Sequence, residues 1–197
     1  QKNQAKIIDY INQAKTKGAD LAVFPELSIT GYPPEDLLLK PKFIKDNLAA
    51  LDEIAAASKG IAVYVGFVHK EGKDIFNAGA FIDNRRIKTV YRKMNLPNYS
   101  VFDEKRYFKE GNKPVVIAFK GVKLKLSICE DMWIDMKAGS KAKTKAGQKA
   151  QIEIVINASP YHIGKQRIRE KVAGARAKDT KAHIIYVNTA GGQDELV

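Results

Sequence analysis

The sequence predicts an α/β fold in which a mixed sheet is covered by helices. Short apolar runs alternate along the chain with segments whose apolar residues recur at helical spacing. Several strand-like runs in the middle are separated only by tight turns, which indicates antiparallel pairing within the same fold. Neither an internal repeat nor a linker interrupts the pattern, so residues 1–197 are interpreted as one domain.

The amino-terminal part predicts a helix, a buried strand and a second helix. Residues 2–17 gather their apolar side chains on one helical face, and Gly18 supplies a stop signal. The apolar strand 20–24 ends at Pro25, because proline cannot donate a hydrogen bond to a strand ladder. Residues 41–58 return to helical spacing.

The central part predicts strands and one long loop. Glycine and charged residues mark turns between its β-rich runs. The runs are 61–68, 75–83, 87–92, 115–119 and 122–128. Residues 94–113 are too polar and irregular for a regular element, and a loop of that length is more often functional than filler.

The carboxyl-terminal part repeats the alternation: a lysine-rich helix at 137–149, a strand at 152–157, a basic helix to about Asp179 and a strand at 183–188. We interpret the basic side chains as a solvated helix face, because no interleaved aromatic residues indicate a specific nucleic-acid surface. They are Lys137, Lys141, Lys143, Lys145, Lys149, Arg167, Arg169, Lys171, Arg176 and Lys178.

Composition excludes several classes of protein. The net charge of +12 would attract anions without sequence specificity. A single cysteine cannot form an internal disulfide, and His69, His162 and His183 show no metal-site spacing, so no metal is expected. His69 and His183 are interpreted as structural strand residues. No apolar run is long enough to span a bilayer and no signal peptide is visible, so we expect no membrane contact and a cytoplasmic location.

Glu26, Lys93 and Cys129 each follow an apolar strand directly. The carboxyl edge of an α/β sheet gathers such side chains into one crevice, so the three can converge. Cys129 lies at a strand-to-helix turn resembling a nucleophile elbow, where positive charge favours the thiolate. Taken singly, a lone cysteine is more often a small core residue, and a glutamate or lysine in a loop is usually solvated.

The local sequences around these residues resemble the three catalytic motifs of the nitrilase superfamily of carbon-nitrogen hydrolases. The motifs are Phe24-Pro25-Glu26, Tyr91-Arg92-Lys93 and Cys129-Glu130-Asp131-Met132-Trp133. Within that superfamily, longer stretches resemble the amidase domain of glutamine-dependent NAD synthetases. These are residues 24–38 with their Pro-Pro-Glu-Asp-Leu-Leu segment, 96–108, and 191–196. The resemblance covers essentially the whole chain and implies an α-β-β-α sandwich with two mixed sheets.

The resemblance also implies a mechanism, in which Cys129 is the nucleophile, Glu26 the general base and Lys93 the cation that stabilises the tetrahedral intermediate. A thioester would form and then be hydrolysed. The substrate would be L-glutamine, and the products glutamate and ammonia. The residues that the resemblance assigns to substrate binding are Tyr99, Glu104, Glu130, Ser159 and Lys165. Lys165 departs from the arginine expected at its position.

No glycine-rich phosphate loop is visible, so no cofactor is expected in this domain. The resemblance implies a carboxyl-terminal synthetase domain that uses ATP and magnesium to convert deamidated NAD to NAD. The chain itself is expected to be truncated at both ends, without its first strand. A homo-oligomer is expected as well, since nitrilase-type domains tend to assemble.

Two alternatives remain at the level of sequence. The first is a free-standing amidase or carbamoylase that uses the same three residues on another small amide. The second is a non-catalytic assembly module whose basic helices serve an interface.

Overall fold

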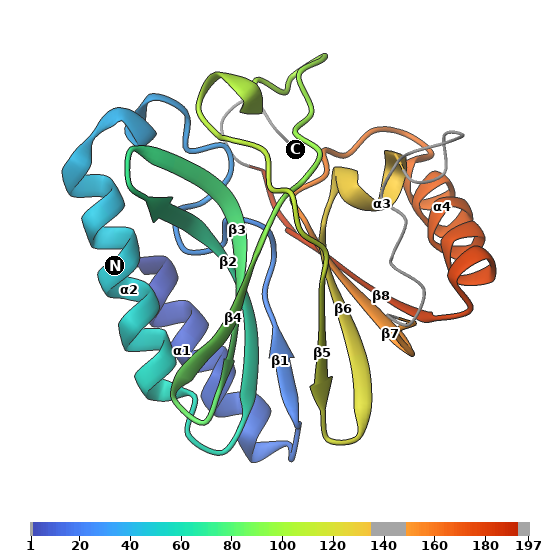
Figure 1. Cartoon of the computed structure of the whole chain (residues 1–197), viewed down its shortest axis with the longest axis horizontal. Helices are drawn as coiled ribbons and strands as arrows, with labels where there is room; N and C mark the ends of the chain where they lie inside the picture. Colours follow the sequence, from blue (N-terminus) through green and yellow to red (C-terminus); the bar gives the residue numbers. More distant parts are fainter. Residues whose placement is uncertain (1, 135–148, 193–197) are drawn as a thin grey trace.

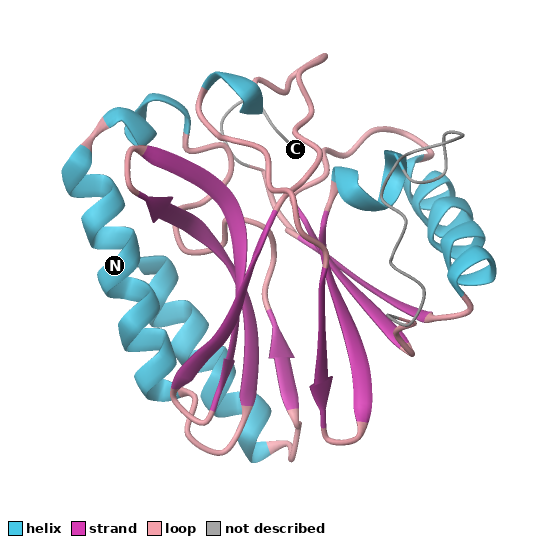
Figure 2. Cartoon of the chain, in the orientation of Figure 1, coloured by secondary structure: helices cyan, strands magenta, loops and turns pink. Residues whose placement is uncertain are grey.

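The computed structural model describes residues 2–134 and 149–192 of the 197-residue chain. Two four-stranded sheets lie face to face, and helices cover their outer faces (Figures 1 and 2). Each sheet contains both parallel and antiparallel pairs. The expected arrangement of two mixed sheets between helices is therefore confirmed.

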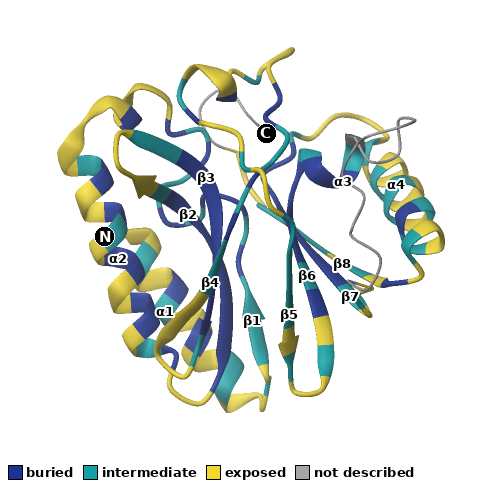
Figure 3. Ribbon diagram, in the orientation of Figure 1, coloured by how far each residue is buried: buried dark blue, intermediate teal, exposed yellow. Residues whose placement is uncertain are grey.

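The first sheet has the strand order β1-β2-β3-β4, and β1 is parallel to β2 whereas the other pairs are antiparallel. Helices α1 and α2 pack on its outer face, and both carry buried as well as exposed residues (Figure 3). Ile11 of α1 and Ile54 of α2 are fully buried in the core that they share with the sheet. The elements are α1 (Lys2–Thr16), β1 (Leu21–Val23), α2 (Pro41–Ala57), β2 (Ala62–Glu71), β3 (Asp74–Asp83) and β4 (Arg86–Arg92). β2 and β3 are buried over most of their length because the sheet is covered on both faces.

The second sheet has the order β5-β6-β7-β8, with β5 antiparallel to β6 and the remaining pairs parallel. The short helix α3 follows β6, and α4 covers the face turned away from the first sheet (Figure 1). The elements are β5 (Val115–Phe119), β6 (Val122–Ile128), α3 (Glu130–Ile134), β7 (Ile152–Asn157), α4 (Lys165–Thr180) and β8 (His183–Asn188).

An apolar layer joins the two sheets. Tyr64 and Tyr91 of the first sheet pack in one cluster with Leu126, Ile154 and Ile156 of the second, and all five are buried. Burial of each large apolar side chain contributes roughly 1.5–3 kcal/mol relative to exposure. This shared core fixes the strand ends of the two sheets relative to each other.

The predicted elements agree with those observed, apart from boundary shifts of a few residues. The segment 94–113 is a loop that contains one 3-10 turn, η2 (Glu104–Arg106), and a second such turn, η1 (Glu35–Leu39), precedes α2. The lysine-rich helix predicted at 137–149 falls almost entirely outside the described residues.

The interpretation of the basic residues of α4 as a solvated face is wrong for Arg176. This side chain is buried and donates to Glu153 of β7 at 2.9 Å, while Lys125 of β6 lies 3.1 Å from the same carboxylate. A carboxylate buried in a sheet requires compensating charge, and Arg176 supplies it. Arg169 is half-buried and also turns inward, as described below.

Candidate active site

Lys93 contacts Glu26, and both charges act on the Cys129 thiol, so the three residues converge. The sequence predicted this convergence at one sheet edge, whereas the residues follow strands of two facing sheets. Glu26 follows β1, Lys93 follows β4 and Cys129 follows β6. Their exposed fractions are 1%, 1% and 5%. Burial of two opposite charges is rare for ordinary loop residues, so the alternative that Glu26 and Lys93 are solvated does not hold. Burial alone does not separate a catalytic Cys129 from a small core cysteine, because Cys129 also packs in an apolar cluster.

Cys129 occupies a strained turn between β6 and α3. Its φ is +43°, in the left-handed region that non-glycine residues seldom adopt. The turn is held because the Cys129 amide donates to Ile156 O at 3.0 Å and the Met132 amide donates to Cys129 O at 3.0 Å. Backbone strain of this kind persists where surrounding contacts over-determine it, and it is concentrated at functional sites. The elbow expected from the sequence is thus present.

Lys93 bridges two buried carboxylates. Its Nζ donates to Glu26 Oε1 at 2.7 Å and to Glu104 Oε1 at 2.7 Å. Burial alone lowers the pKa of Lys93, but Glu104 and Glu26 outweigh it and raise the pKa well above the usual value. Lys93 is therefore a fixed ammonium at neutral pH.

Other donors also reach the two carboxylates, and each carboxylate accepts three hydrogen bonds from the described residues. Asn77 Nδ2 donates to Glu26 Oε1 at 2.7 Å and to Glu104 Oε2 at 3.2 Å. The Ala158 amide donates to Glu26 Oε2 at 3.0 Å, and the Tyr32 hydroxyl donates to Glu104 Oε1 at 2.9 Å. Both carboxylates are therefore held in one orientation, as preorganised catalytic groups must be.

The electrostatic environment keeps the cysteine protonated. Burial, followed by the Glu26 carboxylate, raises the pKa of the Cys129 thiol well above its usual value, and Lys93 only partly opposes this. The sequence-based expectation that positive charge would favour the thiolate is thus wrong in its net direction. A neutral thiol needs a base during attack, and Glu26 belongs to the same buried cluster.

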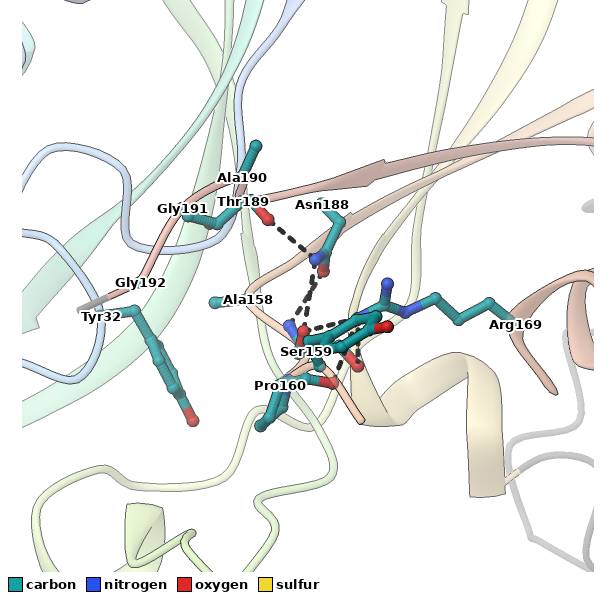
Figure 4. Close-up of a pocket in the computed structure, with 11 residues that line it drawn as sticks. Tyr32, Ala158, Ser159, Pro160, Arg169, Asn188, Thr189, Ala190, Gly191 and Gly192 are labelled. Atoms are coloured by element: carbon teal, nitrogen blue, oxygen red, sulfur yellow. Dashed lines mark hydrogen bonds between the residues drawn. The ribbon is translucent and has the colours of Figure 1, made fainter. Parts of the chain in front are cut away.

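A pocket of about 320 Å³ adjoins the cluster. Glu26, Lys93 and Cys129 are not among the residues that line it. It borders their cluster through Tyr32, which donates to Glu104, and Ala158, whose amide donates to Glu26. Figure 4 shows Arg169 reaching from α4 to the loop after β7, where its Nη2 donates to Ser159 O at 2.7 Å. Arg169 Nε is buried and has no hydrogen-bond partner among the described residues. The pocket is therefore open to an anionic or carbonyl group.

The five predicted substrate-binding residues lie in different places. Ser159 lines the pocket, whereas Glu104 lies on Lys93 within the catalytic cluster. Tyr99 is exposed and donates to Glu130 Oε2 at 2.9 Å. Lys165 Nζ lies 4.8 Å from the centre of the Trp133 ring. The structure thus places Glu104 with the three predicted catalytic residues, Glu26, Lys93 and Cys129, which form the candidate triad. Tyr99 pairs with Glu130, and Lys165 with Trp133, on the segment that follows Cys129.

Sequence reasoning missed the roles of Tyr32, Asn77, Asp131 and Arg169. A signal existed for Asn77, because it is a polar residue in the otherwise apolar run of β3, and a buried amide requires partners. Tyr32 and Asp131 stood inside the recognised motifs without a role. Arg169 was grouped with the solvated charges of its helix.

The backbone that carries Glu26 packs directly against β2 at Gly66. A Cβ at this position would lie 2.3 Å from Leu27 N and 2.4 Å from Pro25 O. We therefore expect Gly66→Ala to displace Glu26, to lower the free energy of unfolding by about 1–3 kcal/mol and to reduce activity sharply. Chemical denaturation and an activity assay measure the two effects.

Gly174→Ala is the matched control. Gly174 lies exposed in α4, and a Cβ there meets nothing within 4 Å. Alanine should stabilise the helix by about 0.5–1 kcal/mol and leave activity unchanged. If both alanine variants behaved alike, the close approach at Gly66 would not constrain Glu26.

Among the described residues, no group of histidine, cysteine, aspartate or glutamate side chains could hold a metal ion. In the same part of the chain, no helix has the length and apolarity needed to cross a membrane.

Comparison with known proteins gives a consistent result. The carbon-nitrogen hydrolase family model matches residues 1–197. The chain is 45% identical over 200 residues to the glutamine-dependent NAD(+) synthetase of Xanthomonas campestris, covering 99% of this chain and 35% of that protein. The Thermotoga maritima glutamine-dependent NAD(+) synthetase is 40% identical, with 99% and 34% covered. The chain thus spans about a third of the length of these relatives.

Solved structures agree. The glutamine-dependent NAD+ synthetase from Acinetobacter baumannii aligns with a TM-score of 0.88 and 38% identity over 100% of this chain and 36% of that one. An amidase from Nesterenkonia sp. aligns with a TM-score of 0.83 at 24% identity over 100% and 73%, a likeness of fold. The resemblance identified from the three motifs is confirmed.

Proposed function

The chain belongs to the carbon-nitrogen hydrolase family, and from this premise we propose that it hydrolyses the side-chain amide of L-glutamine to glutamate and ammonia. Cys129 is the nucleophile, Glu26 the general base and Lys93 the oxyanion-stabilising cation. The observation that carries the proposal is the buried Lys93 ammonium, which donates to Glu26 at 2.7 Å, with both charges close enough to act on the thiol of Cys129, the only cysteine in the sequence.

The first half-reaction forms the thioester. Glu26 takes the thiol proton as Cys129 Sγ attacks the amide carbon, which moves negative charge onto the carbonyl oxygen. The Lys93 ammonium, fixed in a dry site, stabilises that charge by about 3–4 kcal/mol if it acts like a single oxyanion-hole donor. The carbon-nitrogen bond then breaks, and Glu26 returns its proton to the departing nitrogen, which leaves as ammonia.

The second half-reaction regenerates the thiol. Water attacks the thioester while Glu26 takes one of its protons, and Lys93 again faces the developing oxyanion. The carbon-sulfur bond breaks, glutamate leaves, and the proton on Glu26 returns to sulfur. One carboxylate thus serves every proton transfer, which fits its fixed contacts with Lys93, Asn77 and the Ala158 amide.

Substrate recognition requires a group for the α-ammonium of glutamine and one for its α-carboxylate. Ser159 lines the pocket, and Glu130 and Lys165 lie beside the elbow with opposite charges, so they and Tyr99 remain our candidates. Arg169 adds a guanidinium whose Nε lacks a partner among the described residues. Glu104 acts on Lys93 instead, as its 2.7 Å contact supports.

The related synthetases are about three times longer than this chain, and so the remaining functions are part of the proposal. The ammonia would serve a carboxyl-terminal synthetase domain that amidates deamidated NAD with ATP and magnesium. Residues 1–197 would be the amidase domain, without a cofactor of its own, in a cytoplasmic homo-oligomer.

A panel of amides tests the substrate assignment. We expect the intact protein to release ammonia from L-glutamine with kcat/KM at least about 100-fold above that for asparagine, acetamide and a carbamoyl amino acid. Acetamide lacks both charged groups and a carbamoyl amino acid lacks the free ammonium, so each leaves a buried partner unpaired. Asparagine keeps both charged groups but is one methylene shorter, a difference worth up to about 200-fold. Preference for another amide would instead favour the free-standing amidase or carbamoylase, and failure on all of them the assembly module.

A further inference from the structure

Asp131 is a buried carboxylate that receives hydrogen bonds from two different parts of the chain. Its Oδ1 accepts from the Met94 amide at 3.2 Å, the Asn95 amide at 2.8 Å and Asn95 Nδ2 at 2.9 Å. Its Oδ2 accepts from the Tyr91 hydroxyl at 2.7 Å and, more weakly, from the Ile128 amide at 3.4 Å. Only 5% of Asp131 is exposed.

These donors flank the catalytic residues. Tyr91 and Met94 lie on either side of Lys93 along the chain, and Ile128 immediately precedes Cys129. Lys93 follows β4 at the end of the first sheet, and Cys129 follows β6 in the second sheet. The carboxylate of Asp131 links the segment after β4 to the end of β6. This link adds to the contacts that Lys93 makes with Glu26 and Glu104, and it joins the backbone beside Lys93 to the backbone beside Cys129.

We propose that Asp131 is a positioning residue, which sets the Lys93 ammonium relative to the Cys129 sulfur. The role in turnover rests on the proposed function, while the geometric role does not. A merely structural link between two loops would be made at lower cost by apolar packing, since a buried carboxylate needs several donors to offset its desolvation.

The state of the carboxyl group supports this role. Burial raises the pKa of Asp131 to about 6, although Tyr91, Lys93 and Asn95 hold it down. The group is therefore largely ionised at neutral pH, and both oxygens accept hydrogen bonds. Asp131 is not itself a catalytic residue, because it touches the segments that carry the catalytic groups and neither group directly.

The test compares Asp131→Ala, Asp131→Asn and the exposed control Asp46→Asn in the intact protein, by glutamate formation. Displacing Lys93 affects the transition state more than substrate binding, so for Asp131→Ala we expect kcat to fall by about 100-fold and KM to change little. In Asp131→Asn the amide oxygen still accepts from Met94 and Asn95, and its nitrogen can donate to the Tyr91 oxygen, while the weak contact with the Ile128 amide is lost. Its kcat should fall by less than about 10-fold. Asp46→Asn should match the wild type.

The rate at which iodoacetamide alkylates Cys129 is a second measure of the position of Lys93 relative to the thiol, and it requires no substrate turnover. Lys93 lowers the pKa of the thiol, so displacing Lys93 in Asp131→Ala should slow alkylation at neutral pH. Loss of the Asp131 charge alone would speed it. Asp131→Asn loses the charge but keeps the hydrogen bonds to Tyr91, Met94 and Asn95 beside Lys93, so its alkylation should be no slower than that of the wild type.

Specific results would overturn the proposal: an unchanged kcat in Asp131→Ala, equal losses in Asp131→Asn and Asp131→Ala, or faster alkylation in Asp131→Ala. If Asp131→Ala does not fold, Tyr91→Phe replaces it, and an unchanged kcat in that variant overturns the proposal. If the wild type fails to hydrolyse glutamine, the proposed function fails, and the alkylation rates alone decide the positioning role.

Discussion

We expect Cys129→Ser to lower the kcat of amide hydrolysis by on the order of 10⁴-fold or more. Serine preserves the shape of the elbow but replaces sulfur by an oxygen whose proton is far harder to remove. Glu26 is the base available to it, and a carboxylate cannot take a proton from an alcohol as readily as from a thiol. Release of ammonia and of glutamate from the intact protein measures the loss.

A loss of activity in Cys129→Ser reports on the chemical step only if the variant keeps the wild-type fold, including the strained turn at residue 129. Serine has nearly the same volume, so the thermal midpoint of Cys129→Ser should lie within about 2 °C of the wild type. Binding of glutamine, measured calorimetrically, should also persist, because the pocket residues are untouched. Turnover above about 1% of the wild-type rate would show that Cys129 is not the nucleophile.

The position of each triad residue along the chain was predictable because it depends on a strand end. Pro25 closes the strand before Glu26, and the apolar strand before Cys129 is unambiguous, so both residues are expected at strand ends. The same reasoning gave the order of helices and strands. The ends of the strands and the order of the elements are both indicated by local sequence, through prolines, glycines and the spacing of apolar residues. The strands before Glu26 and Cys129 belong to different sheets, and the packing of one sheet on the other, which local sequence does not show, brings the residues together.

The hydrogen-bond partners of the triad were not predictable, because they depend on contacts across the fold. Asn77 donates to Glu26 and Glu104, which are 51 and 27 residues away. Charge pattern also failed for Arg176, since its partner Glu153 lies on the neighbouring strand and not on its own helix. A buried charge is recognised only when the opposite charge is placed beside it.

The direction of the cysteine pKa was wrong for a related reason. The sequence places a lysine near the thiol, but it does not show that Glu26 and Glu104 both lie on that lysine. Two carboxylates offset one ammonium, and burial then favours the neutral thiol. Activation by a base, and not a resting thiolate, is the mechanism this geometry supports.

Glu26→Gln tests that base directly. We expect kcat to fall by on the order of 10³-fold, within the range of 10²–10⁴ that general base catalysis contributes. The glutamine side chain has nearly the same shape but cannot accept the thiol proton or activate water. The residual rate should rise with pH, because the thiolate must then form without the base. A pH profile of glutamate formation measures both effects.

The variant also separates base catalysis from support of the site. The side-chain amide introduced by Glu26→Gln must place its nitrogen against either the Ala158 amide or the Lys93 and Asn77 donors, so a stability loss of about 1–3 kcal/mol accompanies the change. Glu110→Gln is the control, since Glu110 is exposed and pairs only with the exposed Lys105 among the described residues. That variant should match the wild type in rate and stability.

In Glu26→Gln, the alkylation rate of Cys129 should change in the opposite direction to the rate of hydrolysis. The Glu26 carboxylate raises the pKa of the thiol, so its removal should lower that pKa and speed alkylation by iodoacetamide at fixed pH, while hydrolysis nearly stops. If Glu26→Gln displaced Cys129 from the site, alkylation and hydrolysis would both become slower. Hydrolysis that persisted within about tenfold of the wild type would show that another group removes the thiol proton. Glu104, which accepts from the same lysine, would be the next base to test.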